Sequence, residues 1–334
     1  MGTVYITCED SILKKQDERL WVVSPERVTL LDVPLLRVEA VVVLGRATVT
    51  PGLVAVLLER GIPLSFLTGT GRYLGCLQPE LGKNSPLRSA QWRLAQCPER
   101  AEAVVQAFIR GKLANYRHGL QRAQRDHGLA LEAPILALAQ AIEALAVTRG
   151  VDQLRGHEGN GSRVYFGHFQ HLVRHPEFTF QRRVRRPPTD PVNALLSFGY
   201  ALLRHDCQSA VNIVGFDPYL GFLHCERYGR PNLALDLMEE FRPLIVDSVV
   251  LATLNRGMLT LSDFSTEAVS GAVRLSDKGR KLFLKQYELR MNSTFKHPVL
   301  QKQCSYRQAL EWQARLLARY ALGSTDKYPP LILK

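Results

Sequence analysis

In the first eighty positions, apolar residues either alternate with polar ones or form short β-branched runs, which is typical of strands. Segment 50–61 differs, because a threonine and a proline precede an apolar stretch that ends at glycine. That order predicts one short helix. A glycine-containing segment at 68–71 joins two strand patterns and predicts a hairpin. The expected strands are 3–7, 20–23, 28–31, 40–44, 63–67 and 72–77.

The pattern changes after residue 78, where prolines, glycines, asparagine and serine interrupt the chain and predict a linker over 81–90. Beyond it, apolar residues recur at helical spacing. The expected helices are 101–126, 134–148, 164–174, 191–215, 231–242, 244–255, 277–292 and 305–320, of which the Ala/Leu-rich 134–148 is expected to be fully buried. We therefore predict an α+β protein with a β-rich, β-sandwich-like domain over 1–80 and a larger all-helical domain over 91–334.

Composition narrows the class of protein. A hydrophobic content of 46% is ample for a packed core and excludes global disorder. No apolar run approaches the roughly 18 residues of a membrane span, and the N-terminus lacks a signal-peptide pattern. The six cysteines form no CxxC pair, which speaks against a structural zinc site. We expect reduced thiols, a cytoplasmic location and no membrane partner.

Charge is distributed unevenly along the chain. Of the net charge of +12, residues 1–90 carry +1 and the remainder carries +11, which indicates a polyanion-binding surface on the second part. Arginine is densest at Arg182, Arg183, Arg185 and Arg186, next to two prolines. This stretch predicts an extended loop that grips phosphates. A targeting signal or a plain exposed loop would have the same composition.

Two separated segments offer single metal ligands. Glu158 lies among glycines, which permit close approach of a backbone or a phosphate, and we expect it at the start of a helix. His224 follows the apolar stretch 220–223. Each has a simpler explanation, because Glu158 would also suit a helix N-terminus and His224 could be a core histidine with satisfied hydrogen bonds.

A third segment is acidic. Asp236, Glu239 and Glu240 stand at i, i+3 and i+4 on an expected helix and therefore share a face. Their mutual repulsion would be relieved by a cation, although a solvated acidic face is equally consistent with the spacing. Together with Glu158 and His224, these carboxylates would make a mixed oxygen and nitrogen site suited to Mg²⁺ or Mn²⁺.

The order and spacing of these segments resemble those of the CRISPR-associated adaptation integrases, the Cas-one family. The likeness covers nearly the whole chain. The matching segments are Glu158-Gly159 with Tyr165-Phe166, then 191–200, 221–224, 236–243, and 273–275 with 278–280.

The resemblance implies which residues form the site. Glu158, His224 and Glu239 are expected to bind Mg²⁺ or Mn²⁺ and to be the catalytic residues. Asp236 matches a second acidic position near the metal, and Tyr165 matches a tyrosine that lines the site. Within its own motif, Asn193 is expected beside the ligands. The basic residue and the asparagine common on the family's first long helix correspond to Lys112 and Asn115. The expected DNA contacts are Arg182, Arg183, Arg185, Arg186, Lys112 and Arg163.

The function implied is that of a metal-dependent DNA endonuclease and integrase that inserts new spacer DNA into a CRISPR array by transesterification. Its expected partners are double-stranded and branched DNA, a second copy bound through the β-rich domain, and the small Cas-two protein. Two alternatives remain from the residues. One is a metal-dependent nuclease that acts on branched DNA in repair, and the other is a nucleic-acid-binding scaffold without catalytic activity.

Overall fold

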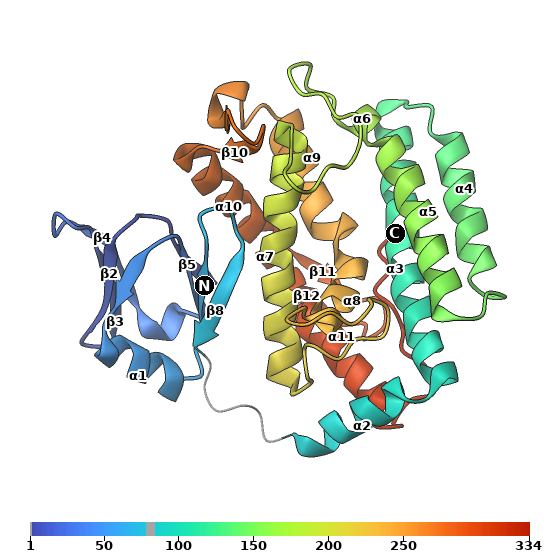
Figure 1. Ribbon diagram of the computed structural model, residues 1–334, viewed down its shortest axis with the longest axis horizontal. Helices are drawn as coiled ribbons and strands as arrows, with labels where there is room; N and C mark the ends of the chain where they lie inside the picture. Colours follow the sequence, from blue (N-terminus) through green and yellow to red (C-terminus); the bar gives the residue numbers. More distant parts are fainter. Residues whose placement is uncertain (1, 78–83) are drawn as a thin grey trace. The chain divides into compact units, whose positions relative to one another are not determined.

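The computed structural model describes residues 2–77 and 84–334, which divide into two compact units (Figure 1). Unit 1 contains the N-terminal strands, and unit 2 contains most of the helices, so the predicted α+β class is confirmed. Asp277–Glu288 groups with unit 1, although the sequence pattern assigned it to the helical domain. Of the expected linker 81–90, residues 81–83 lie outside the described residues, and 85–90 already belong to a helix.

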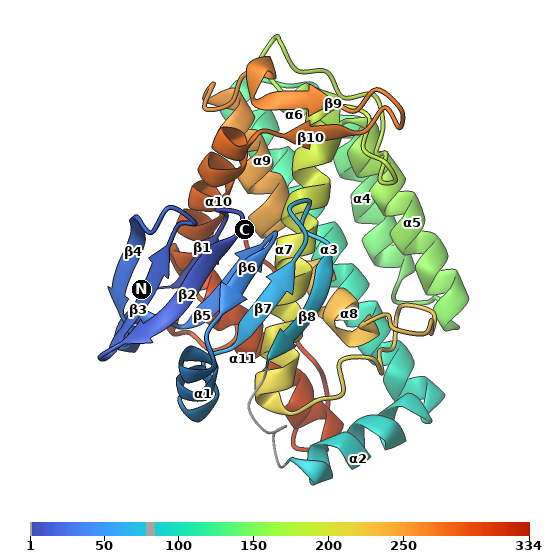
Figure 2. The same cartoon turned by 60° about the vertical axis from the view of Figure 1, so that its left-hand side comes forward.

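Unit 1 is built on two four-stranded sheets. Its elements are β1 (Thr3–Ile6), β2 (Ser11–Gln16), β3 (Arg19–Val23), β4 (Thr29–Pro34), a 3₁₀ turn (Leu35–Arg37), β5 (Ala40–Leu44), β6 (Ala47–Val49), α1 (Pro51–Glu59), β7 (Leu64–Leu67) and β8 (Tyr73–Leu77). One sheet has the order β1-β5-β7-β8, in which the first three strands are parallel and β8 is antiparallel (Figure 2). The other has the order β4-β3-β2-β6.

One apolar core is shared by both sheets and by α1. It includes Leu13 and Leu20 from one sheet, Val41 and Leu64 from the other, and Leu53 from the helix. In β2 and β3 buried and more exposed positions alternate, as in sandwich folds, whereas in β5 and β7 the residue that follows each of these core residues is buried as well. Two sheets that share one core agree with the sandwich-like architecture predicted for this part of the chain.

Unit 2 is mostly helical. Its elements are α2 (Ser85–Ala95), α3 (Pro98–His127), α4 (Glu132–Ala144), α5 (Val151–Gly167), α6 (Phe169–Leu172), α7 (Pro191–Val214), α8 (Asn232–Phe241), a π-helical turn (Pro243–Asp247), α9 (Ser248–Asn255), a 3₁₀ turn (Leu261–Asp263), β9 (Phe264–Thr266), β10 (Val273–Leu275), α10 (Asp277–Asn292, shared with unit 1), β11 (Thr294–Lys296), β12 (Gln303–Ser305) and α11 (Tyr306–Ala321). The pairs β9–β10 and β11–β12 are small antiparallel sheets that the sequence pattern did not predict.

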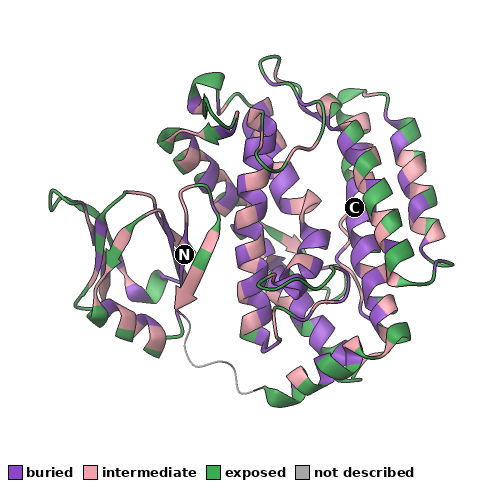
Figure 3. Cartoon of the chain, viewed as in Figure 1, coloured by how far each residue is buried: buried purple, intermediate pink, exposed green. Residues whose placement is uncertain are grey.

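Two long helices organise unit 2. Helix α3 packs against α4, α5 and α8, and α7 packs against α8 and α11 (Figure 1). Helix α7 is buried along most of its length, and its buried residues include polar ones such as Asn193, His205 and Gln208 (Figure 3). Among the helices of residues 2–77 and 84–334, none has the length and apolarity that a bilayer-spanning segment requires.

Local sequence signals explain where these helices begin and end. Helix α7 has Pro191 in its first turn and starts at Asp190, whose side chain accepts a hydrogen bond from the Asn193 amide. It stops at Gly215, which has φ +100° and so needs the conformational freedom of glycine. Helix α2 begins at Ser85, within the expected linker, because the side chain of Asn84 accepts a hydrogen bond from the Leu87 amide and caps the helix.

Two expectations for the helices were wrong. Helix α4 is only half buried, because Leu136 and other residues of its outer face are exposed. Helix α5 begins at Val151, so Glu158 lies in the middle of a helix and not at its start. The glycine that matters for packing is Gly161, where an added Cβ would come within 2.3 Å of Leu113 on α3. At Gly156 and Gly159, which flank Glu158, an added Cβ would meet nothing within 4 Å.

Candidate functional site

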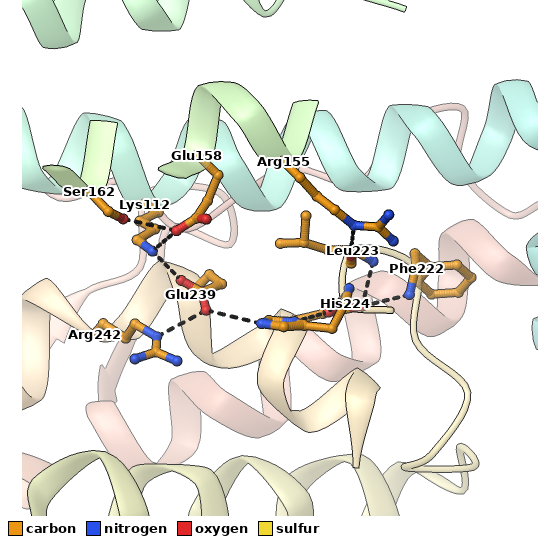
Figure 4. A network of polar contacts seen from close by, with 10 residues as sticks. Lys112, Arg155, Glu158, Ser162, Phe222, Leu223, His224, Glu239 and Arg242 are labelled. Atoms are coloured by element: carbon orange, nitrogen blue, oxygen red, sulfur yellow. Dashed lines mark hydrogen bonds and ion pairs between the residues drawn. The ribbon is translucent and has the colours of Figure 1, made fainter. Parts of the chain in front are cut away.

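Glu158, His224 and Glu239 meet in unit 2, although 66 and 81 residues separate the second and third from the first. Figure 4 shows Glu158 on α5, His224 on the loop before α8, and Glu239 on α8 itself. Nε2 of His224 lies 3.8 Å from Oε1 of Glu239. Between the two glutamates lies the ammonium of Lys112 from α3, which is 2.6 Å from Oε2 of Glu239 and is hydrogen-bonded to Glu158.

Asp236 positions the loop that carries His224. Its fully buried carboxylate accepts hydrogen bonds from the backbone amides of Phe222, Leu223 and His224. The same carboxylate lies 2.6 Å from Nδ1 of His224. The loop sits so close that a Cβ at Gly221 would come within 2.7 Å of the carboxylate. Nδ1 of His224 therefore faces Asp236 while Nε2 faces Glu239, and metal-binding histidines commonly have their second ring nitrogen held by a carboxylate in this way.

Glu239 is held as an anion. Burial alone would raise the pKa of its carboxyl group, but Arg242, Lys112 and His224 outweigh that effect and lower the pKa to about 2. Nε of Arg242 donates to Oε1 at 3.0 Å. Oε2 lies 2.6 Å from the ammonium of Lys112 and has no other ion-pair or hydrogen-bond partner among the described residues. One cation therefore already lies against this buried oxygen.

The donor set suits a divalent cation. It offers two carboxylates and one imidazole nitrogen, and the Glu158 and His224 side chains are 26% and 20% exposed, so the site is open to solvent on one side. Within the described residues, no three His, Cys, Asp or Glu side chains already stand together as a ligand set. At this site the ammonium of Lys112 lies between the two glutamates.

Glu240 does not share the site, so the expectation of three acidic groups on one face was wrong. Its side chain turns away to accept hydrogen bonds from Tyr328, Gln313 and the Leu331 amide. The alternative of a solvated acidic face was also wrong, because Asp236, Glu239 and Glu240 are all buried. Helical spacing gave their rough direction, but the C-terminal segment around Leu331 decides where Glu240 points.

We expect Glu240 to make folding stability depend on pH. Burial raises the pKa of this carboxyl group from 4.5 to about 8, although three hydrogen-bond donors oppose the shift. A raised pKa means that the stabilising contribution is complete below pH 4.5 and is lost as the pH rises toward 8. The loss is about 1.4 kcal/mol per pH unit in that window. Denaturant unfolding from pH 5 to 8 should therefore show a steeper decline for the wild type than for Glu240→Gln.

The glutamine variant is suitable because Oε1 of Gln313 is buried without a hydrogen-bond partner. A turned Gln313 amide can accept a hydrogen bond from a neutral acid or from an amide at position 240. Glu143→Gln, on the exposed face of α4, is the control and should keep the wild-type slope. Parallel curves for the wild type and Glu240→Gln would show that Glu240 is ionised throughout.

The other residues expected near the ligands occupy different positions. Tyr165 stacks on Tyr116 with ring centroids 3.7 Å apart, and the ammonium of Lys112 lies 5.6 Å from the Tyr116 ring, so Tyr165 forms part of the wall behind the site. Burial raises the pKa of Tyr165, which keeps its phenol protonated. Asn115 binds the backbone oxygens of Glu240 and Leu331 and thus anchors the C-terminal segment.

Asn193 was expected beside the ligands, but it serves the arginine-rich loop. Its side chain binds the backbone of Arg182 and Val184 and accepts a hydrogen bond from Arg183. Arg183 itself turns inward, donates to Ser197 and lies over the ring of Tyr200. The expectation that all four arginines grip phosphates was therefore wrong for Arg183.

Arg182, Arg185 and Arg186 remain exposed on that loop, and Arg163 is exposed on α5, where it donates to Asn160. Lys112 was also expected to contact DNA. It is only 4% exposed and its ammonium is taken up by two carboxylates, so this structure does not present it to a phosphate backbone.

Two residues of the site were missed by the sequence analysis. Arg242 binds Glu239, and Ser162 donates to Oε1 of Glu158. Both follow their partners at helical spacing, i+3 for the arginine and i+4 for the serine. That spacing is a signal that could have identified them once the two glutamates were chosen.

Comparisons with known proteins found a matching family, similar curated proteins and similar solved structures. Residues 4–289 match the family described as CRISPR associated protein Cas1. A relative from Rhodospirillum rubrum, named CRISPR-associated endonuclease Cas1 2, is 42% identical and aligns over 100% of this chain and 99% of its own length. A casposase bound to its integration product has the same fold, with a TM-score of 0.84 at 22% identity over 98% of this chain and 93% of its own. A chain of a Cas6-RT-Cas1–Cas2 complex has a TM-score of 0.83 at 25% identity, over 100% of this chain and 36% of its own.

Proposed function

From the premise that this chain belongs to the CRISPR-associated Cas1 family, we propose that it is a metal-dependent DNA endonuclease and integrase that inserts new spacer DNA into a CRISPR array. The observation that carries the proposal is the convergence of Glu158, His224 and Glu239 on one site that is open to solvent on one side. The full-length relative is itself named an endonuclease.

In this proposal Glu158, His224 and Glu239 hold Mg²⁺ or Mn²⁺. When bound, the ion would polarise a phosphodiester oxygen and stabilise the charge that develops on it. Asp236 keeps the proton of His224 on Nδ1, so that Nε2 stays available. Arg242 holds Oε1 of Glu239 and thereby orients its carboxylate.

The proposed reaction is a transesterification. The 3′-hydroxyl oxygen of the incoming DNA forms a bond to phosphorus, and the bond from that phosphorus to the 3′ oxygen of the target strand breaks. The number of phosphodiester bonds is unchanged, so no external energy source is needed. The departing oxygen receives a proton, and the attacking hydroxyl loses one.

The proposed partners are duplex and branched DNA, a second copy of this chain bound through the β-rich part, and a small Cas2 protein. The excess positive charge after residue 90 supports the DNA partner. The Cas2 partner is supported by the likeness to a chain of a complex whose name includes Cas1 and Cas2. A monomer at micromolar concentration in a sizing experiment would contradict the dimer.

One experiment tests the activity against its alternatives. The protein, with and without a Cas2 partner, is incubated with a supercoiled repeat plasmid and labelled duplex DNA in Mn²⁺ or in chelator. Metal-dependent transfer of the label into the plasmid supports the integrase. Cleavage of branched DNA without joining would instead indicate a repair nuclease. Binding without any reaction, unchanged by chelator, would indicate a scaffold.

We expect the arginine-rich loop to contribute to DNA binding through three residues. If Arg182, Arg185 and Arg186 each neutralise one phosphate, they contribute about −2.7 to the log–log salt slope of duplex binding. Replacing all three by alanine should flatten that slope and weaken binding to every duplex sequence about equally, because phosphate contacts carry no sequence information. Binding isotherms at several salt concentrations measure both effects.

A matched control removes the same charge elsewhere. Arg27, Arg37 and Arg72 are exposed in unit 1, and their triple alanine variant should keep a slope near that of the wild type. Equal flattening by both triple variants would mean that net charge alone drives binding. An unchanged slope in the loop variant would mean that the loop does not contact the DNA backbone.

A further inference from the structure

The ammonium of Lys112 fills the space between the two glutamates of the site. It lies 2.6 Å from Oε2 of Glu239 and is hydrogen-bonded to Oε1 of Glu158, and its side chain is 5% exposed (Figure 4). A lysine buried to this degree is rare unless its charge is paired. Both oxygens that it touches belong to side chains of the proposed metal site.

Lys112 is also the cation that joins these two glutamates. Arg242 binds Oε1 of Glu239 from the other side and has no hydrogen bond or ion pair with Glu158 among the contacts of the described residues. Asp236 is satisfied by three backbone amides and by His224, so it needs no further cation. Without Lys112, the two neighbouring carboxylates would repel each other, and Arg242 and His224 would remain beside Glu239 alone among the contacts of the described residues.

We propose that Lys112 is an internal counter-cation that closes the metal-free site and is displaced when a divalent ion binds. The inference rests on the proposed metal dependence. A divalent ion held by the carboxylates of Glu158 and Glu239 would need the space that the ammonium fills, and two cations could not share it. The long flexible stem of lysine allows the ammonium to withdraw while the helix stays in place.

Calorimetric titration of the metal-free protein with Mn²⁺ tests this proposal. Lys112→Met should bind Mn²⁺ at least about tenfold more tightly than the wild type, because a competing positive charge is gone. The matched control is Arg110→Met, which removes an exposed charge from the same helix two residues away and should bind like the wild type. Glu158→Ala should lose this binding and so identifies the site.

Thermal unfolding in chelator gives a second readout. Without metal, Lys112→Met should melt at a lower temperature than the wild type. Added Mn²⁺ should raise its melting temperature by more than it raises that of the wild type. If Lys112→Met does not fold, Lys112→Gln keeps a hydrogen-bond donor without the charge and should show the same tighter binding.

The outcomes separate this inference from the proposed function. Equal Mn²⁺ affinity in the wild type and both Lys112 variants, all of it lost in Glu158→Ala, would overturn the counter-cation and leave the metal site standing. If Glu158→Ala left Mn²⁺ binding unchanged, both in the wild type and in the Lys112 variants, the metal site itself would be overturned. Mn²⁺ binding that is tighter in the Lys112 variants than in the wild type, and that is lost in Glu158→Ala, supports both the counter-cation and the metal site.

Discussion

Replacing Glu158 by alanine is expected to abolish DNA cleavage and joining while leaving the fold intact. Losing one of the three proposed ligands should remove several kcal/mol of transition-state stabilisation, which corresponds to about a thousandfold or more in rate. The fold should survive because position 158 lies inside α5, where alanine is the best helix former. Lys112 would also keep its ion pair with Glu239.

The measurement is the rate of strand joining and cleavage with saturating Mn²⁺, alongside circular dichroism and the melting temperature. Glu143→Ala removes an exposed glutamate from α4 and should retain wild-type rates. His224→Ala and Glu239→Ala should lose activity as Glu158→Ala does, although Glu239→Ala also leaves the buried Arg242 without its partner and should be less stable. Near-normal joining by folded Glu158→Ala would refute its assignment as a ligand.

Local signals in the sequence were sufficient for most of the fold. Proline in the first turn and glycine after the last one bracket α7, and a run of apolar residues marks β3. The strand β2 was not assigned, because Ser11 and Leu13 face inward while Ile12 is exposed, so apolar and polar residues do not alternate there. These signals depend on residues close together in the chain, so a single sequence contains them.

The prediction that the three site residues meet did not come from such local signals. Nothing in the spacing of Glu158, His224 and Glu239 shows that three distant segments meet, and the family resemblance supplied that expectation. Physically, the meeting depends on the packing of α3 against both α5 and α8. Gly161 allows α5 to lie close to Leu113 of α3, a tertiary contact without a local signature.

The direction of individual side chains was the least predictable property. Glu239 and Glu240 are adjacent, yet one points to His224 and the other to Tyr328. Arg183 and Arg182 are also adjacent, yet the first is held by Ser197 and the second is exposed. In both pairs the deciding partner is distant in sequence or belongs to another element, so the composition of the segment could not separate neighbours.

Asp236 is the residue whose role the structure defines most clearly beyond the sequence. A second acidic position near the metal was expected from the resemblance, without a role. In the structure it accepts hydrogen bonds from three consecutive backbone amides of the His224 loop and binds Nδ1 of His224. It holds the loop and the Nδ1 side of the imidazole together, which makes it a candidate for a residue that positions a proposed metal ligand.

We expect Asp236→Asn and Asp236→Ala to fail in different ways. Asparagine keeps one acceptor oxygen for the loop amides but loses the charged partner of His224, so Mn²⁺ affinity and joining should fall about 10–100-fold with a small change in melting temperature. Alanine leaves three buried amides without an acceptor, each at a cost of about 1–3 kcal/mol, so stability should fall as well. Calorimetry, joining rates and thermal unfolding together separate the two effects.

The control for this pair is Asp217→Asn. Asp217 accepts a hydrogen bond from the Tyr219 amide in the segment leading to the same loop, but its side chain has no hydrogen bond to His224 among the described contacts. Asp217→Asn should keep wild-type Mn²⁺ affinity.

If Asp236→Asn also kept wild-type Mn²⁺ affinity, the imidazole would be oriented by its own packing, and the carboxylate would serve only to cap the backbone. If instead Asp236→Asn lost stability as severely as Asp236→Ala, the effect on metal binding would follow from a collapsed loop. Only a loss of affinity with a preserved fold assigns Asp236 to the orientation of His224.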